Sequence, residues 1–193
     1  MSDLTITNAG VSVTAKSPGS SNAGSSREII RIKPTLAAAE HHDDDVLFTN
    51  VEIPNAVQGE GGISMLKSAY LVDYGKEDTD VDVLLVFTEK NTNAFGTVNA
   101  TCNISDADFE ANKPVGYLKL DGQATVAAAI DNNYMHQFLP ATGTGESSNA
   151  NMYLKADDGS TSVYMHAVIT GVDGSTNPTY ADGQYELIFH IEY

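Results

Sequence analysis

The stretch Val81-Asp82-Val83-Leu84-Leu85-Val86-Phe87-Thr88 is the most apolar run in the chain. A short, nearly continuous apolar run is typical of a strand that is buried on both faces of its sheet. We therefore expect a central strand here, with the other elements of the chain packed around it.

Shorter strand patterns recur on both sides of this run, separated by turns rich in Gly, Asn, Asp and Pro. In the last of them Tyr185, Leu187, Phe189, Ile191 and Tyr193 alternate with other residues, which predicts one buried and one solvent-exposed face. No segment carries a long 3.6-residue period. Single helical turns are expected at residues 36–40 and, capped by Ser105, at residues 106–112. The sequence therefore predicts an all-β fold, an antiparallel β-sandwich or jelly roll with an extended N-terminal arm. The expected strands cover residues 27–32, 46–53, 63–74, 81–88, 115–120, 125–130, 152–155, 162–170 and 184–193.

Composition excludes several classes of protein. The chain has 193 residues, with 10 Lys and Arg against 26 Asp and Glu, for a formal charge of −16. A surface this acidic repels phosphates, so we expect no nucleic-acid partner. No stretch approaches the roughly 18 apolar residues of a membrane helix, and no signal peptide is expected. Cys102 stands alone and is expected to be a small buried residue, with neither a disulfide framework nor a multi-Cys zinc site.

The charge is unevenly distributed. Residues 1–34 hold four basic and two acidic side chains, a net charge of +2, whereas residues 35–193 hold six Lys and 24 acids, a net charge of −18. We therefore divide the chain into an N-terminal arm and linker, residues 1–34, and a β-sandwich body, residues 35–193. Both arginines, Arg27 and Arg31, fall in the arm, where their planar guanidinium groups are suited to binding carboxylates of the body or of a neighbour. The alternative is that this segment is a solubilising tail.

The arm has a strand-like beginning. Leu4, Ile6, Val11 and Val13 alternate with polar residues around a turn, and a Ser- and Gly-rich linker follows. A two-stranded piece is marginally stable alone, so it must pair with its own body, a symmetry mate or another protein. The candidate interface residues are therefore Leu4, Ile6, Val11, Val13, Arg27 and Arg31.

Two clusters have the composition of metal ligands. Asp78, Asp80, Asp82 and Glu89 match the spacing of a calcium loop, but Val83 stands where that loop needs Gly. We expect a solvated acidic row instead; a weak cation site at a subunit contact stays open. The run 41–45, His-His-Asp-Asp-Asp, places its ligand types side by side, which favours a polar loop. No metal and no cofactor are expected.

Catalytic patterns are weak. No Gly-x-Ser-x-Gly elbow surrounds a serine, and Cys102 has no activating neighbour in sequence. His136, His166 and His190 are expected to be partly buried, with their hydrogen bonds satisfied. A pair of converging carboxylates, as in a glycoside hydrolase, stays open because an acidic chain offers many pairs. We expect no catalytic residues and no enzymatic activity.

Several short motifs in residues 46–193 occur in a familiar order. They are Ile53-Pro54-Asn55-Ala56, the stretch 61–69 followed by Leu71-Val72-Asp73, the apolar strand ending at Phe87, Ser105–Asp108 before Val115-Gly116-Tyr117-Leu118, and Tyr164–Val168 before Pro178-Thr179-Tyr180 and Leu187–Ile191. Together they resemble small virion proteins of tailed bacteriophages. The resemblance implies a capsid decoration or cement protein, or a related head protein, often a β-sandwich trimer. It brings no catalytic residues and does not reach residues 1–45.

These observations predict a non-enzymatic virion protein that decorates or cements a phage capsid. It would be made in the host cytoplasm, act on the capsid surface as a homo-oligomer, with a trimer favoured, and bind the major capsid protein or another head protein. The arm would attach by adding a strand to its partner. The alternative is a tail or receptor-binding module that recognises carbohydrate with loops at one end of the sandwich.

Overall fold

The computed structural model describes residues 4–8, 11–15, 26–75, 80–120, 128–130, 133–138, 151–173 and 177–193, and nearly all of its regular structure is β. The strands are β1 (Leu4–Asn8), β2 (Val11–Ala15), β3 (Arg27–Ile32), β4 (Ala39–Glu40), β5 (Val46–Ile53), β6 (Ile63–Asp73), β7 (Asp80–Thr88), β8 (Pro114–Leu120), β9 (Ala128–Ile130), β10 (Asn133–Phe138), β11 (Met152–Lys155), β12 (Val163–Asp173), β13 (Thr179–Tyr180) and β14 (Tyr185–Glu192); the helix α1 is Asp106–Ala111.

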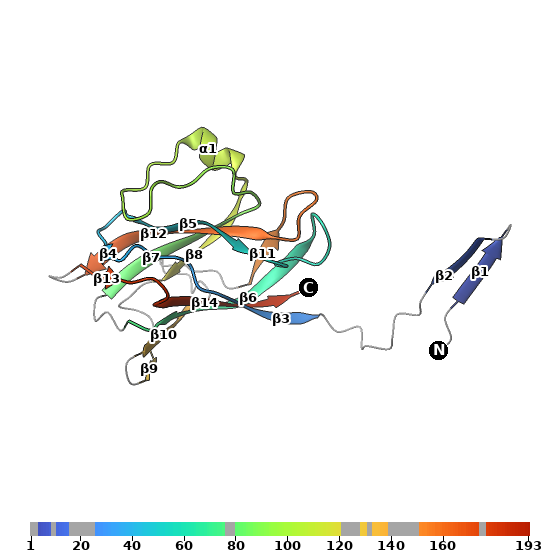
Figure 1. The fold of residues 1–193 in the computed structure, drawn as a ribbon, viewed down its shortest axis with the longest axis horizontal. Coiled ribbons are helices and arrows are strands. Elements are labelled where there is room, and N and C mark those ends of the chain that lie inside the picture. The colour runs from blue at the N-terminus through green and yellow to red at the C-terminus, as the bar shows by residue number, and fades with distance from the viewer. Residues whose placement is uncertain are drawn as a thin grey trace.

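Two antiparallel sheets face each other (Figure 1). The first has the order β3-β14-β6-β10-β9, with β11 also pairing along β6. The second has the order β5-β12-β7-β8. Two small pairs complete the described sheets, β13 with β4 and β1 with β2. The all-β sandwich expected from the sequence is therefore confirmed.

The strand order is that of a jelly roll. Along the chain β3 pairs with β14, β5 with β12, β6 with β10 and β11, and β7 with β8, as in one long hairpin. The hairpin is rolled so that β14 also pairs with β6 and β12 with β7. Rolling a hairpin in this way produces the two four-stranded sheets of the jelly roll, here with β10 and β11 sharing one strand position.

The main core lies between the sheets. On β7 the buried residues Val83, Leu85 and Phe87 belong to it, as does Phe189 of β14. The rings of Phe87 and Phe189 meet edge to face with centroids 5.9 Å apart, which joins the centres of the two sheets. The expectation of a central, buried strand at residues 81–88 is confirmed.

A second, smaller core lies on the outer face of the second sheet. The connection between β7 and β8, residues 89–113 with α1, arches over this face (Figure 1). Beneath it Val46, Val86, Phe95 and Val168 form a buried cluster. This cover explains why β7 is apolar on both faces, and the half-buried Cys102 packs against the same cluster.

The helical turn expected after Ser105 is confirmed. α1 begins at Asp106, and the Ser105 hydroxyl accepts a hydrogen bond from the Asp108 backbone N–H at 3.2 Å. A side-chain oxygen at this position satisfies one of the otherwise unpaired N–H groups of the first turn.

The helical turn expected at residues 36–40 is wrong. Residues 36–38 form no helical turn, and Ala39–Glu40 forms β4, which pairs with β13. The buried Leu36 belongs to the main core. Long-range pairing and burial thus override the local preference, since single helical turns have little stability of their own.

The second face of the last strand, β14, was expected to be exposed to solvent, but it is exposed only in part. Tyr185, Leu187, Phe189 and Ile191 are buried as expected and Tyr193 is half-buried, but Glu186 and Ile188 on the opposite face are only 8% and 4% exposed. Glu186 accepts hydrogen bonds from Tyr74 Oη at 2.6 Å and from Arg31 Nη1 at 3.3 Å. Side chains of the neighbouring strands therefore cover this end of the face.

Candidate functional site

The two long sides of the sandwich differ. On one side β8 contacts both β10 and β11, so the edges of the two sheets meet. On the other side lie β3 and β5, the terminal strands of the two sheets, joined by the chain that leaves β3 at Lys33. We call this second side the open side. It is also where the N-terminal segment enters the body, because β3 is the first body strand.

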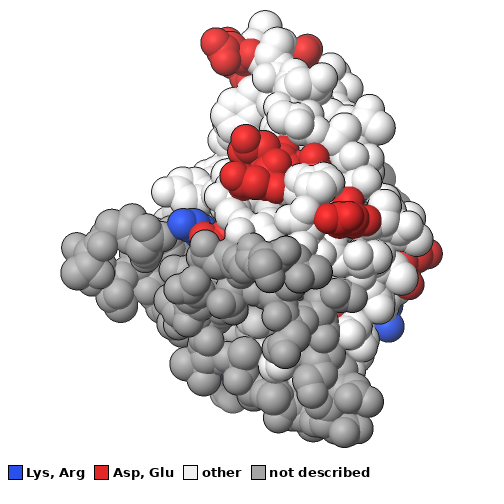
Figure 2. Space-filling view, turned by 90° about the vertical axis from the view of Figure 1, so that its left-hand side faces the viewer, with Lys and Arg blue, Asp and Glu red and all other residues white. Residues whose placement is uncertain are grey.

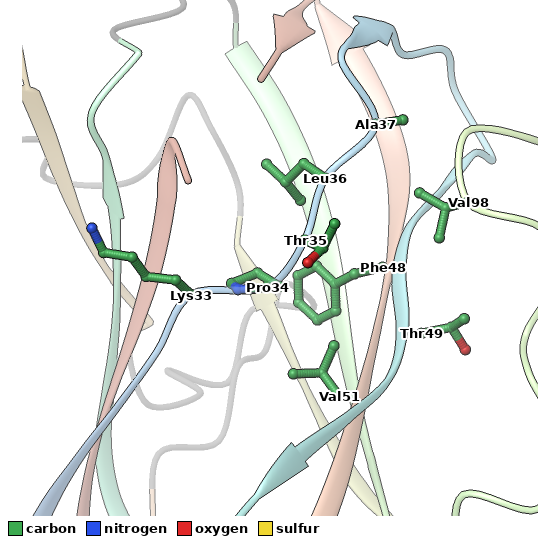
Figure 3. A pocket seen from close by; sticks show the side chains of 9 residues that line it. All are labelled: Lys33, Pro34, Thr35, Leu36, Ala37, Phe48, Thr49, Val51 and Val98. Carbon is green, nitrogen blue, oxygen red and sulfur yellow. The ribbon is translucent and has the colours of Figure 1, made fainter. Parts of the chain in front are cut away.

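An apolar groove runs along the open side (Figure 3). One wall is the segment 33–37, which includes Pro34, and the other is β5, whose Phe48 side chain extends toward that segment. The groove has a volume of about 540 Å³. Its lining residues are Lys33, Pro34, Thr35, Leu36, Ala37, Phe48, Thr49, Val51 and Val98, of which Lys33 alone is charged.

The groove follows a strand edge with little backbone pairing. At Val46 the outer edge of β5 is bonded to residues 98–100, through Val46 N–H to Ala100 O at 2.9 Å and Asn99 N–H to Val46 O at 2.8 Å. From residue 48 to residue 53 no described strand pairs with this edge. An apolar groove beside such an edge is the arrangement that accepts an added strand.

The two arginines lie on β3, within the body sheet. Arg27 pairs with Glu192 at 3.8 Å and Arg31 with Glu186 at 3.3 Å, both on the neighbouring strand β14. They thus meet carboxylates of their own chain, and residues 27–32 of the expected arm form a strand of the sandwich. The hydrogen bond to Glu186 is the main reason that the pKa of Tyr74 is raised.

For the arm, the structure describes only the backbone pairing of β1 with β2. Ile6 lies opposite Val13, Leu4 opposite Ala15 and Asn8 opposite Val11. In the described sheets these two strands pair only with each other. The side chains of Leu4, Ile6, Val11 and Val13 lie outside the part of the chain that the structure describes.

A second, shallower groove of about 440 Å³ crosses the outer face of the first sheet. Tyr153 and Ile63 on its rim are 64% and 58% exposed. Lys67 and Glu192 form an ion pair of 3.8 Å within it, and Tyr193 lies at its end. This face thus offers one exposed ring, that of Tyr153, beside opposite charges.

The expected metal-ligand clusters are spread out by the fold. Within 41–45, His41 is buried against Tyr180 while His42 is exposed and contacts Asn177, so the run forms a polar turn as expected. Burial lowers the pKa of His41. Among the described residues no three His, Cys, Asp or Glu side chains are placed to hold a metal ion.

The spacing that matched a calcium loop lies largely along a strand. Residues 80–88 form β7, at whose two ends Asp82 pairs with Lys119 at 3.6 Å and Glu89 with Lys155 at 3.0 Å. Strand geometry therefore separates these two carboxylates. Asp78 and the side chain of Asp80 lie outside the described residues.

The histidines differ in their surroundings. His166 is fully buried and hydrogen-bonded through both ring nitrogens, to Thr49 at 2.8 Å and to Thr88 at 3.1 Å. His190 is half-buried and contacts Ser68 at 3.0 Å. His136 is half-buried as well, and desolvation lowers its pKa.

Acidic side chains are dispersed over the surface that can be seen. Figure 2 shows several separate groups of Asp and Glu on one face. Several acids are paired: Glu89, Asp157, Glu186 and Glu192 each form an ion pair with Lys or Arg. In the described residues α1 is too short and too polar to cross a membrane.

Sequence reasoning did not single out the lining of the apolar groove. Pro34, Leu36, Phe48 and Val98 come from segments that are separated in sequence, and only the fold brings them together. Pro34 after Lys33 predicts the end of a strand, but it carries no signal of a groove. Comparison with models of protein families found no match to this chain, and no curated protein matched it either.

Proposed function

We propose that the protein is a non-enzymatic virion structural protein that decorates or cements a phage capsid and attaches through its N-terminal arm. Its partner would be the major capsid protein or another head protein, and its working form a homo-oligomer, with a trimer favoured, on the capsid surface. The ordered motifs that resemble phage virion proteins support this assignment. The jelly roll is common in viral capsid proteins, although it also serves lectins and cupins, so the fold alone does not decide.

The observation that carries the proposal is the position of the arm. The chain passes from the linker directly into β3, an edge strand on the open side of the sandwich. Upstream, β1 and β2 form a hairpin that in the described sheets pairs with nothing else. A two-stranded hairpin gains stability only by packing against a further surface, so an arm of this kind is suited to attachment.

Attachment through an arm also fits the chemistry of the body. Residues 26–193 hold the whole excess of negative charge, −16, because residues 1–25 contain one Lys and one Asp. A strongly acidic body is repelled by other acidic surfaces, whereas residues 1–25, which carry no net charge, are not. Main-chain hydrogen bonds would give the arm affinity, and its alternating apolar residues would fix its register.

Deletion of residues 1–25 tests the proposal. Ser26 is kept because its carbonyl accepts a hydrogen bond from the Tyr193 N–H at 2.8 Å. The truncated protein should still fold and unfold cooperatively, since the main core lies within residues 30–191. It should also fail to bind purified heads in a sedimentation assay. Decoration at full occupancy by the truncated protein would show that the arm is not the attachment device.

A second candidate function is carbohydrate recognition by a tail or receptor-binding module. The shallow groove on the first sheet favours it, because Tyr153 presents an exposed ring close to the Lys67–Glu192 pair. Such rings can stack on sugars while charged groups bind hydroxyls. A glycan array tests this function: specific binding that Tyr153→Ala abolishes and Tyr117→Ala, at another exposed tyrosine, leaves intact would favour it over decoration.

A further inference from the structure

We infer that the apolar groove on the open side receives the Leu4–Ala15 hairpin of a second copy of this chain, so that exchanged arms hold neighbouring copies together. The inference rests on the proposed function in one respect, that the arm is a docking element. It adds the receptor, which is the groove between residues 33–37 and β5 of the next copy.

In the register of the hairpin, most apolar residues are paired with apolar residues and hydroxyl residues with hydroxyl residues. Ile6 stands opposite Val13 and Leu4 opposite Ala15, while Thr5 stands opposite Thr14 and Thr7 opposite Ser12. Directly opposed residues share one face of an antiparallel pair, and alternate pairs share the same face. By register, the pairs Leu4–Ala15, Ile6–Val13 and Asn8–Val11 therefore share one face, apolar except for Asn8, and the pairs of hydroxyl residues share the other. The apolar face needs a surface to cover it.

The groove matches this face in chemistry and in length. Its lining is largely apolar, and two of the lining residues, Val51 and Val98, are only half-buried. The arm strands are five residues each, and the edge of β5 without a described strand partner runs from residue 48 to residue 53. Asn50, with a φ of 55°, interrupts regular pairing in the middle of this edge. Burial of apolar side chains is therefore the main expected source of affinity.

Charge favours exchange between copies over direct contact of their bodies. Residues 26–193 of two copies, with a net charge of −16 each, repel one another, whereas residues 1–25 carry only Lys16 and Asp3 and have no net charge. The linker, residues 16–25, can span at most about 35 Å when extended, so the hairpin can lie well away from the edge of its own body. Head-to-tail contacts of this type close into a ring when the rotation between copies closes, which agrees with the trimer expected above.

Matched pairs of variants in the full chain test the arm and the groove. Ile6→Asp places a charge on the apolar face of the hairpin, and Thr7→Asp places the same charge on the hydroxyl face. Ala37→Trp fills the groove, and Ala107→Trp adds the same bulk at an exposed position of α1. Light scattering and sedimentation equilibrium give the oligomeric state, and thermal denaturation confirms that each variant is folded.

We expect the unaltered chain, Thr7→Asp and Ala107→Trp to associate with equal affinity. Ile6→Asp and Ala37→Trp should weaken association at least tenfold. A monomeric unaltered chain, or an oligomer that persists in Ala37→Trp or Ile6→Asp, would overturn the inference.

Disulfide trapping identifies whose groove is occupied. In a Cys102→Ser background, a chain with Ile6→Cys is mixed with a chain with Val98→Cys and oxidised. A disulfide between the two chains is expected, and none when Ile63→Cys, in the other groove, replaces Val98→Cys. If the double variant Ile6→Cys, Val98→Cys instead closes within a single monomeric chain, the arm occupies its own groove and exchange is wrong.

The outcomes also separate this inference from the proposed function. An oligomer that persists in Ala37→Trp rules out arm exchange but leaves arm-mediated attachment to heads standing. Heads decorated normally by the protein lacking residues 1–25 rule out that attachment, while dissociation of the same truncated protein in solution still supports exchange.

Discussion

The ring of Phe95 lies flat on the ring of His166, with centroids 4.0 Å apart and planes inclined by 12°. Phe95 belongs to the cover formed by residues 89–113, and His166 to the central strand pair of the second sheet. The Phe95 N–H also donates to Thr49 Oγ1 at 3.0 Å, and the Thr49 hydroxyl contacts His166 Nδ1. This stacked pair therefore fastens the cover to the sheet.

The surrounding hydrogen bonds select one neutral form of His166. The Thr88 hydroxyl donates to Lys90 O at 2.7 Å, so it accepts from Nε2–H of the ring at 3.1 Å. Nδ1 accepts from the Asn50 N–H at 3.2 Å, which leaves no room for a proton there. Burial lowers the pKa of His166 to about 4.

The first prediction is that the protein loses stability in mild acid through His166. The unfolded ring titrates near 6.5 and the folded ring near 4, so between these pH values the unfolded chain binds a proton that the native protein does not. The free energy of unfolding should fall by about 2–3 kcal/mol between pH 7 and pH 4.5 from this group alone. Urea denaturation at the two pH values measures the loss. His166→Gln should show a smaller loss than the unaltered protein; equal losses would contradict the assignment.

The second prediction concerns the ring that stacks on His166. Phe95→Ala should lower the free energy of unfolding by about 3–5 kcal/mol, because it empties the centre of the smaller core. Phe109→Ala is the matched control: Phe109 contacts Phe95 edge to face but is 36% exposed, so its removal should cost much less. Comparable losses for the two variants would show that the cover is not fastened by Phe95.

The third prediction concerns the contact between the sheets. Phe189→Ala should destabilise the protein by about 3–5 kcal/mol, because it leaves a cavity beside Phe87 in the main core. Phe189→Leu keeps most of the volume and should cost less than about 2 kcal/mol. Chemical denaturation of both variants, with similar slopes, would measure the difference; a negligible effect of Phe189→Ala would exclude tight packing between the sheets here.

The fourth prediction compares two glycines of the turn between β5 and β6. A Cβ at Gly62 would lie 2.5 Å from the backbone oxygen of Gln58 and 2.8 Å from that of Gly59, so the turn itself must shift. Gly59 has a φ of 81°, but a Cβ there would meet nothing within 4 Å, so Gly59→Ala should cost only about 1–2 kcal/mol of left-handed strain. Thermal denaturation should therefore rank Gly62→Ala as the more damaging change, and the reverse order would contradict this turn geometry.

In β6 the alternation of apolar residues in the sequence does not predict which side chains are buried along the whole strand. Met65, Ala69 and Leu71 occupy alternate positions in sequence, yet Ala69 and Leu71 are buried while Met65 is only partly buried. The pairing with β14 shifts between His190 and Ile191, so that Lys67 is an extra residue in β6. Such a bulge moves the following side chains to the opposite face. It depends on the partner strand, and the sequence of β6 does not reveal it.

The candidate sites, too, were predicted only in part from the sequence. The sequence located Arg27 and Arg31 in a strand and predicted that they meet carboxylates, but not that those carboxylates belong to β14. It predicted hydrogen-bonded histidines, but not the stacking of Phe95 on His166, because residues 95 and 166 are far apart in the chain. The apolar groove could not be predicted, because no single segment of the sequence contains its lining residues.

By itself the sequence determined the class of the fold, the position of most strands, the central place of residues 81–88 and the contrast between an acidic body and a slightly basic arm. These features depend on local hydrophobic periodicity, turn residues and composition, which the chain carries in consecutive residues. Only the tertiary structure decided the jelly-roll order of the strands, the bulge in β6, the cover over His166 and the open side with its groove. Each of these follows from which distant strands pair and which edges remain without a described partner, and that choice is made by the packing of the whole core.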